Sequence, residues 1–324
     1  MRILSGTTPT GELHLGNYFG AVRQWVELQS RGEALFFIAD YHALTTVRDA
    51  ETMASNVRAV ALAYLALGLD PERTVLFRHS DVPEVCELTW ILSTVTPMGL
   101  LERCHAYKDK VAQGISSDHG LFTYPVLMAS DILIYRSDLV PVGQDQKQHV
   151  EVTRDIAIKF NQSYGDVFPL PEAHILEQVA KVPGVDGRKM SKSYCNDIRI
   201  FDPEKQVRKK IFSIVTDSAG LEDAKEPQGN IIFELYKLLA PPEKVQELAE
   251  RFRAGGMGYG HAKESLFEEF MDRFGSMRKK HQELANDLSH VEEILESGAR
   301  KARNLARETM EAVREATGLS RRLV

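Results

Sequence analysis

The sequence predicts an α/β fold in which a parallel sheet with covering helices is followed by an all-helical C-terminal region. Two observations lead to this fold class: short apolar runs alternate with helical stretches over residues 1–80, and almost purely helical patterns follow residue 200. The 324 residues, 43% of them hydrophobic and 27% charged, can bury an ample core in one large domain or two modest ones.

The first elements follow one another as strand, helix, strand, helix and strand. Strands are predicted at residues 2–5, 34–39 and 75–77, and helices at residues 18–28 and 52–67. This βαβαβ order is typical of a parallel sheet, where ligands bind beyond the carboxyl ends of the strands. We therefore expect the chemistry in the segments after the strands, at residues 6–17, 40–45 and 142–148.

The remainder of the chain is predicted to be mainly helical. Residues 82–111 form a helical stretch with a break at Thr96 and Pro97, and two more helices are expected at residues 125–135 and 146–160, where Pro125 suits a first helical position. Beyond a stretch rich in Pro and Gly at residues 183–197, helices are predicted at residues 203–214, 230–239, 242–253, 261–287 and 290–316. That stretch is the candidate boundary between residues 1–182 and 183–324.

Composition limits the location, the cysteine chemistry and the partners. No apolar run approaches the roughly 18 residues of a membrane span, and the first residues lack the apolar stretch of a signal peptide, so we expect a cytoplasmic protein without membrane contact. The three cysteines, Cys86, Cys104 and Cys195, show no CxxC spacing, which argues against a disulfide framework and against a protein-bound metal. The net charge of −6 does not indicate a nucleic-acid partner. The basic clusters at residues 208–210 and 278–280 could still contact phosphate, although most such clusters are solvated helix faces.

The segment after the first predicted strand has the composition of a phosphate site. Residues 9–17, PTGELHLGN, open the first long helix, and a helix N-terminus can receive phosphate. Gly16 lets a nucleotide approach the backbone, and His14 and Asn17 supply hydrogen-bond donors. Taken alone, the pattern HxGN is weak, because a His and a Gly at a helix start are usually capping and packing residues.

A second phosphate motif, KMSKS, occupies residues 189–193 between Gly184, Gly187 and Asn196. Two lysines and two hydroxyls on a loop able to move suit a polyphosphate whose negative charge grows as a leaving group departs. For an isolated KxxK, a solvent-exposed basic turn would be the better interpretation. HxGN early in the chain and KMSKS late are far more specific together than either is alone.

These two motifs resemble the HIGH and KMSKS signatures of class I aminoacyl-tRNA synthetases, at residues 14–17 and 189–193. The resemblance runs the full length of the chain and is closest to the tryptophanyl branch of that family, through YKDK at residues 107–110, DQKQH at residues 145–149 and TDS at residues 216–218. It implies a homodimer with a Rossmann-type catalytic domain at residues 1–182, which includes a helical dimer-interface insertion at residues 82–107, and a helical anticodon-binding region at residues 183–324. It also implies L-tryptophan, ATP with Mg²⁺ and tRNA(Trp) as substrates.

The resemblance further implies an ATP site on both motifs. The residues carried over are Thr8, Pro9, Thr10, Gly16 and Asn17 around ATP, Gly143, Gln144 and Asp145 on the ribose side, Val182 at adenine, and Lys189, Met190, Ser191, Lys192 and Ser193 around the phosphates. Three positions depart from the family pattern. Asn17 replaces the last His of HIGH, which is usual in the tryptophanyl branch, Thr8 replaces a longer polar residue, and Cys195 stands where Gly or a polar turn residue is expected.

Tyr124, Met128 and Asp131 are spaced i, i+4 and i+7, so a helix would present all three on one face. Such a stripe is usually core packing. A buried acid on an otherwise apolar face needs a partner, however, and the indole N–H, which can only donate, fits this role. Tyrosyl relatives carry Gln where this chain has Met128, whose soft side chain suits a bicyclic ring.

The other pocket residues surround this stripe. Val140 and Val142 are expected beside Met128, and by resemblance Tyr124 and Gln146 hold the α-ammonium group. His42 is expected to close the pocket, with a hydrogen-bonded core histidine as the alternative.

The implied reaction is an in-line attack of the tryptophan carboxylate on the α-phosphorus of ATP, after which the aminoacyl group passes to the terminal ribose of tRNA. Magnesium pyrophosphate leaves in the first step, and catalysis rests on positioning and charge stabilisation, with no side chain as nucleophile or base. The candidate catalytic residues are His14, Asn17, Lys189 and Lys192, with Lys108 and Lys110 as weaker candidates.

Three alternatives stay open at this point. A tyrosyl-specific enzyme is disfavoured by Met128, and a small nucleotidylyltransferase would not need the helical region after residue 200. A non-catalytic paralogue that senses tryptophan or tRNA is disfavoured by the intact HLGN and KMSKS motifs.

Overall fold

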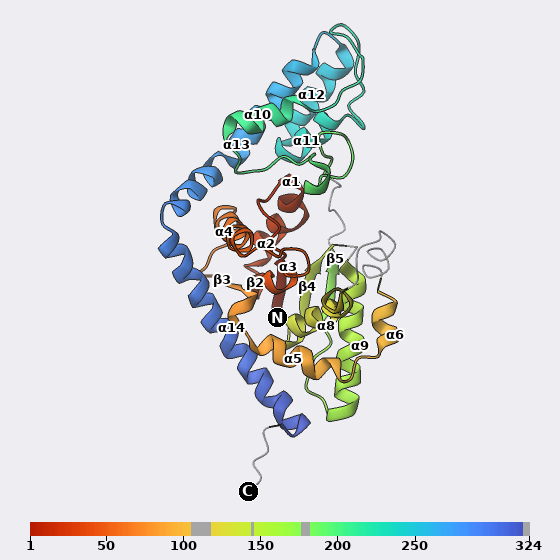
Figure 1. Ribbon diagram of the computed structural model, residues 1–324. Helices are drawn as coiled ribbons and strands as arrows, with labels where there is room; N and C mark the ends of the chain where they lie inside the picture. The colour runs from red at the N-terminus through yellow and green to blue at the C-terminus, as the bar shows by residue number, and fades with distance from the viewer. Residues whose placement is uncertain (105–117, 144–145, 176–181, 320–324) are drawn as a thin grey trace.

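A computed structural model gives the structure of the chain and describes residues 1–104, 118–143, 146–175 and 182–319. Its centre is a five-stranded, all-parallel sheet with the strand order β3-β2-β1-β4-β5 (Figure 1). The strands are β1 (Arg2–Thr7), β2 (Glu33–Ile38), β3 (Thr74–Arg78), β4 (Leu139–Val142) and β5 (Glu172–Ile175). The predicted parallel sheet is confirmed, and β1, β2 and β3 lie where strands are expected from the sequence.

Helices cover both faces of the sheet, and each face has its own apolar core. The helices between the strands are α2 (Arg23–Leu28), α4 (Ala50–Ala66), α5 (Glu84–Ser93), α6 (Met98–Glu102), α8 (His119–Ile134) and α9 (Lys147–Tyr164). Adjacent strand residues enter opposite cores: Ile3 packs with α2 and α4, whereas Leu4 packs with α5, α8 and α9. A parallel sheet that is covered on both faces needs apolar side chains on both, which explains the continuous apolar runs of its central strands.

Short helical turns follow the carboxyl ends of the strands and carry most of the predicted site. They are α1 (Leu15–Asn17), a π-helical turn at Tyr18–Val22, α3 (Asp40–Ala43) and a 3₁₀ turn at His79–Asp81. All of them lie at the same edge of the sheet, because the strands are parallel.

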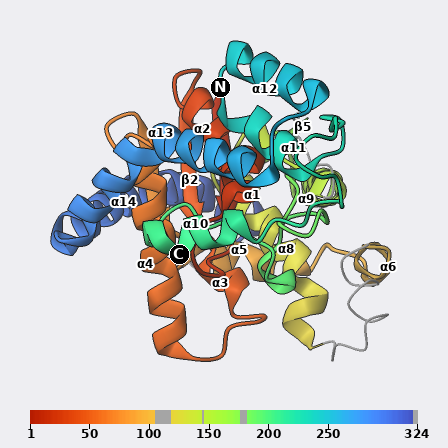
Figure 2. The same ribbon diagram turned by 90° about the horizontal axis from the view of Figure 1, so that it is seen from above.

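The C-terminal region is helical, as predicted, with α10 (Glu204–Phe212), α11 (Ile231–Leu239), α12 (Pro242–Ala254), α13 (Tyr259–Ala285) and α14 (Leu288–Thr317). The long helix α13 passes α4, and α14 then runs back along the sheet (Figures 1 and 2). At Gly298 a Cβ atom would lie 1.8 Å from the carbonyl oxygen of Leu76, so only glycine lets α14 pack this closely on β3. Since β3 is an edge strand, α14 covers an edge that would otherwise be open to another chain.

Two expectations about secondary structure differ from the structure. The helix expected at residues 125–135 begins at His119, because the Asp118 carboxylate accepts a hydrogen bond from the Leu121 N–H at 2.8 Å and caps it there. Pro125 therefore lies inside α8, and its predicted place as first helical residue is wrong. The strand β5 was not predicted, since its four residues are exposed or half-buried and show no apolar run.

The break at Thr96 and Pro97 is confirmed between α5 and α6, whereas residues 105–111 of that predicted stretch lie outside the described residues. Within the described part of the chain, no helix combines the length and the apolar composition that a membrane crossing requires.

Candidate active site

His14 and Asn17 cap each other at the start of α1. The Asn17 N–H donates to His14 Nδ1 at 3.3 Å, and the His14 N–H donates to Asn17 Oδ1 at 3.1 Å. Burial, with a contribution from the Lys192 charge, lowers the pKa of His14 to about 4, so the ring is neutral at neutral pH. Because Nδ1 accepts, the single ring proton is on Nε2, and each of the two side chains keeps a donor that the cap does not use.

Gly16 has a second reason to be glycine besides nucleotide approach. A Cβ atom there would lie 2.9 Å from two atoms of the His14 ring and 3.6 Å from Cβ of Met190. The absence of a side chain thus lets the imidazole fold back into its capping position and lets the second motif pack against the first. Sequence reasoning missed this packing role.

The KMSKS segment is organised around one buried asparagine. Asn196, 1% exposed, accepts from the Ser191 N–H at 2.8 Å through Oδ1, and its amide nitrogen donates to Asp186 Oδ1 at 2.7 Å and to the Lys189 carbonyl at 3.2 Å. A Cβ atom on Gly184 would lie 2.2 Å from Asn196 Nδ2, so glycine is required there. The sequence places Asn196 among the residues that make the loop able to move. In the structure its hydrogen bonds join residues 186, 189 and 191 of the same loop and so fix the conformation of the loop.

The remaining residues of this segment differ in exposure. Met190 is buried in the core and its N–H donates to the Val182 carbonyl at 3.0 Å, whereas Lys189 and Ser193 are exposed. Ser191 and Ser193 hydroxyls are 3.3 Å apart. Cys195 has a φ of 50°, in the left-handed region that favours glycine, which explains why a cysteine is unexpected at this position.

The two motifs meet, although 172 positions separate Asn17 from Lys189 in the sequence numbering. The Leu15 N–H donates to the Ile198 carbonyl at 3.0 Å, and the Ile200 N–H donates to the Leu13 carbonyl at 3.1 Å, which joins the two segments as an antiparallel bridge. The Lys192 ammonium lies 3.3 Å from the Thr10 carbonyl oxygen and 3.4 Å from its hydroxyl. Lys192 is therefore held over the segment that follows β1.

Side chains of helices α10 and α13 contact the segment that follows KMSKS. Arg278 of α13 donates to the carbonyls of Ile200 and Asp202, the latter at 2.7 Å. The His281 ring, one turn later, stacks on Phe201 with a centroid distance of 4.1 Å. We call Arg278 and His281 the α13 clamp.

Some residues of the two basic clusters form ion pairs or hydrogen bonds with other parts of the protein. In the first cluster Arg208 forms an ion pair with Glu264, and Lys210 donates to the Cys195 carbonyl at 2.5 Å. In the second, Arg278 belongs to the α13 clamp. Arg208, Lys210 and Arg278 bind other parts of the protein. The clusters therefore cannot be read as sets of unoccupied cations available to phosphate.

Asp131 is 2% exposed on α8 and lies between two histidines. His42 Nε2 is hydrogen-bonded to Asp131 Oδ2 at 2.8 Å, and His79 Nε2 lies 2.7 Å from Oδ1 in a contact that is not aligned as a hydrogen bond. Burial alone would raise the pKa of Asp131, but the His79 and His42 rings beside the carboxylate have the larger effect and lower this pKa to about 2. The carboxylate is ionised at neutral pH, and Oδ1 has no aligned donor among the described residues.

Asp131 is not unpaired in the absence of a ligand, contrary to the expectation from the sequence, because His42 is hydrogen-bonded to one of its oxygens. His79 was missed in the sequence, where it stands 52 positions before Asp131 with no local motif around it.

Tyr124 and Gln146 are joined through His149. The Tyr124 hydroxyl lies 2.8 Å from His149 Nε2, and His149 Nδ1 lies 3.0 Å from Gln146 Oε1. A neutral imidazole that donates from Nδ1 to the amide oxygen accepts the tyrosine proton at Nε2. His149, 3% exposed, was part of the DQKQH stretch but was not predicted as a site residue.

The three apolar residues predicted for the pocket belong to one core cluster. Val140 is buried in β4, and Met128 and Val142 are half-buried against the same core. His42 and Tyr124 line a cavity of about 420 Å³ at α3, α5 and α8. Gly143 follows β4 and its carbonyl accepts from the Gln146 N–H at 2.9 Å. Gln144, Asp145, Lys108 and Lys110, predicted for ATP contacts, lie outside the described residues.

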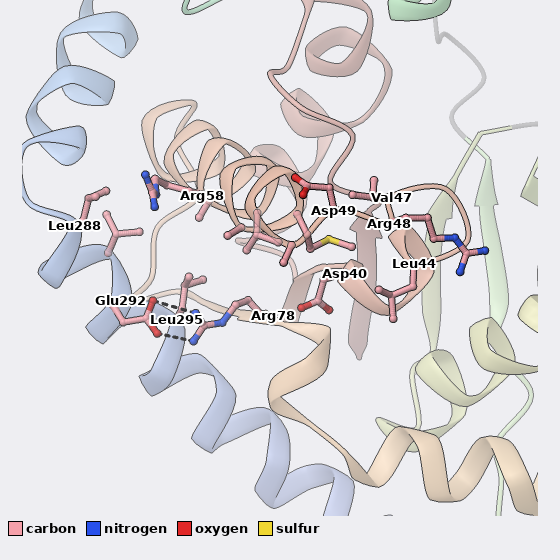
Figure 3. A pocket seen from close by; sticks show the side chains of 16 residues that line it. Asp40, Leu44, Val47, Arg48, Asp49, Arg58, Arg78, Leu288, Glu292 and Leu295 are labelled. Atoms are coloured by element: carbon pink, nitrogen blue, oxygen red, sulfur yellow. Dashed lines mark hydrogen bonds and ion pairs between the residues drawn. The ribbon is translucent and has the colours of Figure 1, made fainter. Parts of the chain in front are cut away.

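A larger cavity of about 790 Å³ lies elsewhere, between the start of α4 and α14 (Figure 3). Its walls are mainly apolar, and its charged groups are largely paired: Arg78 contacts both Glu292 oxygens, and Asp49 caps α4 through the Thr52 N–H. None of the predicted site residues lines it. Size alone is therefore a poor guide to the active site here.

Comparisons with known proteins agree with the resemblance. The family model described as tRNA synthetases class I (W and Y) matches residues 1–275. The chain is 53% identical over 319 residues to the tryptophan–tRNA ligase of Rhodopirellula baltica, covering 98% of this chain and 100% of the relative.

Two solved structures are also similar. The Campylobacter jejuni tryptophanyl-tRNA synthetase complexed with ADP and tryptophan has a TM-score of 0.94 at 52% identity, covering 98% of this chain and 100% of that one. The Mycoplasma pneumoniae tryptophanyl-tRNA synthetase has a TM-score of 0.82 at 30% identity, with coverages of 98% and 97%.

Proposed function

We infer that this chain, which belongs to the class I tRNA synthetases for tryptophan and tyrosine, joins L-tryptophan to tRNA(Trp) at the expense of ATP. The activity follows from relatives named tryptophan–tRNA ligase that match almost the whole chain at 52 and 53% identity. The solved relative that holds ADP and tryptophan supports the same two small substrates.

Tryptophan rather than tyrosine is supported above all by Asp131. Its carboxylate is ionised and buried, and one of its oxygens, Oδ1, lacks an aligned donor among the described residues. A buried acceptor without a partner costs about 1–3 kcal/mol, so a ligand that donates there gains binding energy. The indole N–H is such a donor, and Met128, Val140 and Val142 would contact the ring face.

The other end of the amino acid would meet Tyr124 and Gln146. Their oxygens are both hydrogen-bonded to His149, whose Nε2 accepts the proton of the phenol. Two acceptor oxygens suit an ammonium group, which has three donors and no acceptor.

MgATP would lie along the joined motifs, with its phosphates facing Lys192, Lys189 and the free donors of His14 and Asn17. The carboxylate of tryptophan attacks the α-phosphorus, the bond to the β,γ-pyrophosphate breaks, and Mg²⁺ leaves with pyrophosphate. A hydroxyl of the terminal ribose of tRNA then attacks the acyl carbon of the adenylate, the bond between this carbon and the phosphate oxygen breaks, and AMP leaves. Fixed donors that are already aimed at the growing charge lower the barrier without reorganisation.

Three further parts of the proposal rest on family membership. We expect a homodimer, and Trp90 on α5, 73% exposed, is an apolar side chain suited to such an interface. We expect residues 1–182 to form the catalytic domain and residues 183–324 to carry the anticodon-binding region. A cytoplasmic location is expected for a chain that serves translation.

Pyrophosphate exchange tests the role of Asp131. The measured quantity is kcat/KM for tryptophan and for its sulfur analogue benzothienylalanine, which lacks the N–H donor. A site built around one hydrogen bond can discriminate by on the order of 10⁴-fold, so Asp131→Ala should lose much of this factor for tryptophan and far less for the analogue. Asp131→Asn should fall between, because a charge-assisted bond is about twice as strong as a neutral one.

Ser130→Ala is the matched control, since Ser130 is the adjacent buried polar residue and its hydroxyl bonds within the protein. It should affect both substrates alike. If Asp131→Ala lowers kcat/KM for tryptophan and for benzothienylalanine in parallel, the indole is recognised elsewhere. Exchange with tyrosine above that with tryptophan would establish the tyrosyl alternative instead.

A further inference from the structure

His79 is a buried histidine to which the expected chemistry assigns no role. It lies in the 3₁₀ turn after β3, is 1% exposed, and places Nε2 2.7 Å from Asp131 Oδ1. Its ring stacks on that of His42 at a centroid distance of 5.6 Å and an interplanar angle of 23°. Two histidines from different loops thus approach one carboxylate, one on each oxygen.

The separation of 2.7 Å fixes where the proton of His79 must be. Two bare lone pairs would repel each other at this distance, so one of the two atoms carries a proton. Asp131 does not supply it at neutral pH, because the pKa of that carboxyl is about 2. Both ring nitrogens of His79 are buried without an aligned hydrogen bond among the described residues, but a proton on Nε2 has a carboxylate oxygen 2.7 Å away, whereas a proton on Nδ1 would be an unsatisfied buried donor. Both considerations put the proton on Nε2.

A metal ion is the obvious alternative for two histidines and an aspartate whose ligand atoms lie within 4.8 Å of one another. A tetrahedral ion about 2.1 Å from each ligand atom would keep those atoms roughly 3.4 Å apart. The contacts of 2.7 and 2.8 Å to Asp131 are shorter than this and correspond to hydrogen-bonding distances. The geometry therefore favours protons between these groups.

We propose that His79 is a positioning residue for amino-acid specificity: its Nε2–H lies against Asp131 Oδ1 without an aligned hydrogen bond, while His42 is hydrogen-bonded to Oδ2, and the two rings together hold the carboxylate so that Oδ1 can accept the indole N–H. The proposal rests on the assignment of Asp131 as the indole acceptor. A carboxylate held by two donors keeps its charge and its rotamer, and a fixed acceptor discriminates between substrates better than one that can turn away.

Four titratable groups act on Asp131 from the elements around it. They are His42 of α3, His79, Cys86 of α5 and Tyr135 at the end of α8. The thiol and the phenol have pKa values raised by burial and by the carboxylate, and both are neutral at neutral pH. Without His79, His42 would be the one ring in the described part of the chain that holds the carboxylate.

The test compares His79→Phe, which fills the space but cannot donate, with His79→Gln, whose amide N–H₂ can replace Nε2–H. We expect the ratio of kcat/KM for tryptophan to that for benzothienylalanine to fall about tenfold or more in His79→Phe, and to recover largely in His79→Gln. Tyr41→Phe is the matched control, because it keeps the ring that packs 4.9 Å from His79 and removes only a hydroxyl. It should leave the ratio unchanged.

The outcomes separate this proposal from the one it rests on. If Asp131→Asn leaves the ratio unchanged, the assignment of the indole acceptor is wrong. If Asp131→Asn lowers the ratio and His79→Phe does not, only the role of His79 is wrong. Should His79→Phe fail to fold, ¹⁵N shifts of the His79 ring in the unaltered protein decide the matter: a protonated Nε2 supports the proposal, and a bare Nε2 overturns it.

Discussion

Replacing Arg278 by glutamine should weaken the ATP site from a distance. Arg278 makes two charge-assisted hydrogen bonds, to the carbonyls of Ile200 and Asp202, directly after the segment that pairs with His14. Such bonds contribute about 1.5–3 kcal/mol each when buried. Because the Arg278 side chain is half-buried, each bond is expected to contribute at the low end of this range. Glutamine can keep part of the bonding, so the loss of the two bonds should cost about 2 kcal/mol in total. If this cost falls on the assembled ATP site, kcat/KM for ATP should drop about 30-fold.

The assay is pyrophosphate exchange with ATP and tryptophan varied separately, together with equilibrium binding of tryptophan. Tryptophan affinity should stay unchanged, because Asp131 and Tyr124 belong to α8 and do not contact the α13 clamp. Lys279→Gln is the control: the Lys279 side chain is 80% exposed and, among the described residues, forms an ion pair with Glu283 at 3.9 Å. A parallel loss of ATP and tryptophan parameters, or an equal effect of Lys279→Gln, would refute the reasoning.

Three further predictions concern the same site and the dimer. Lys192→Ala removes the ammonium held beside Thr10 and should slow adenylate formation by roughly two to three orders of magnitude in single-turnover experiments, with little change in tryptophan binding. The pKa of His14 is about 4 in the folded protein and 6.5 in the unfolded chain, so between pH 6.5 and 4 the unfolded chain binds a proton that the folded protein does not. The free energy of unfolding should therefore decrease as the pH falls through this window, by up to about 1.4 kcal/mol per pH unit. Urea unfolding at several pH values should show a flatter decline for His14→Asn, and an identical decline would contradict the assignment. Trp90→Glu should shift sedimentation from dimer to monomer if exposed Trp90 lies in a dimer interface, and an unaltered sedimentation profile would exclude it from that interface.

The helical region could be predicted almost to the residue because local signals agree there. The helix expected at residues 242–253 is Pro242–Ala254, where proline occupies the first turn and Gly255 follows the end with a φ of 74°. At Pro125 two local rules compete, and the Asp118 cap decides the start of the helix. β5 has too few buried side chains to leave a pattern in the sequence, so only its pairing with β4 defines it.

The site was predictable where motifs carry it and not where contacts between distant segments do. HLGN and KMSKS are local patterns, and the structure brings them together through two backbone hydrogen bonds. His79 and His149 are single histidines whose importance depends on Asp131 and Tyr124, which are far from them in the sequence or on another helix. No periodicity or spacing indicates such pairs, since they arise only when the loops at the carboxyl edge of the sheet are folded together.

The boundary expected near residue 183 separates two segments that are hydrogen-bonded to each other in the structure. Leu13 and Leu15 lie on one side of it, and their backbone partners Ile200 and Ile198 lie on the other. Helix α13 holds the second segment through the α13 clamp and also packs on α4, while α14 covers β3. His14 is lowered in pKa partly by Lys192, which comes from across the boundary. The neutral state of His14 on one motif therefore depends in part on the Lys192 cation of the other, and residues 1–182 alone would lack both this charge and the backbone partners of Leu13 and Leu15.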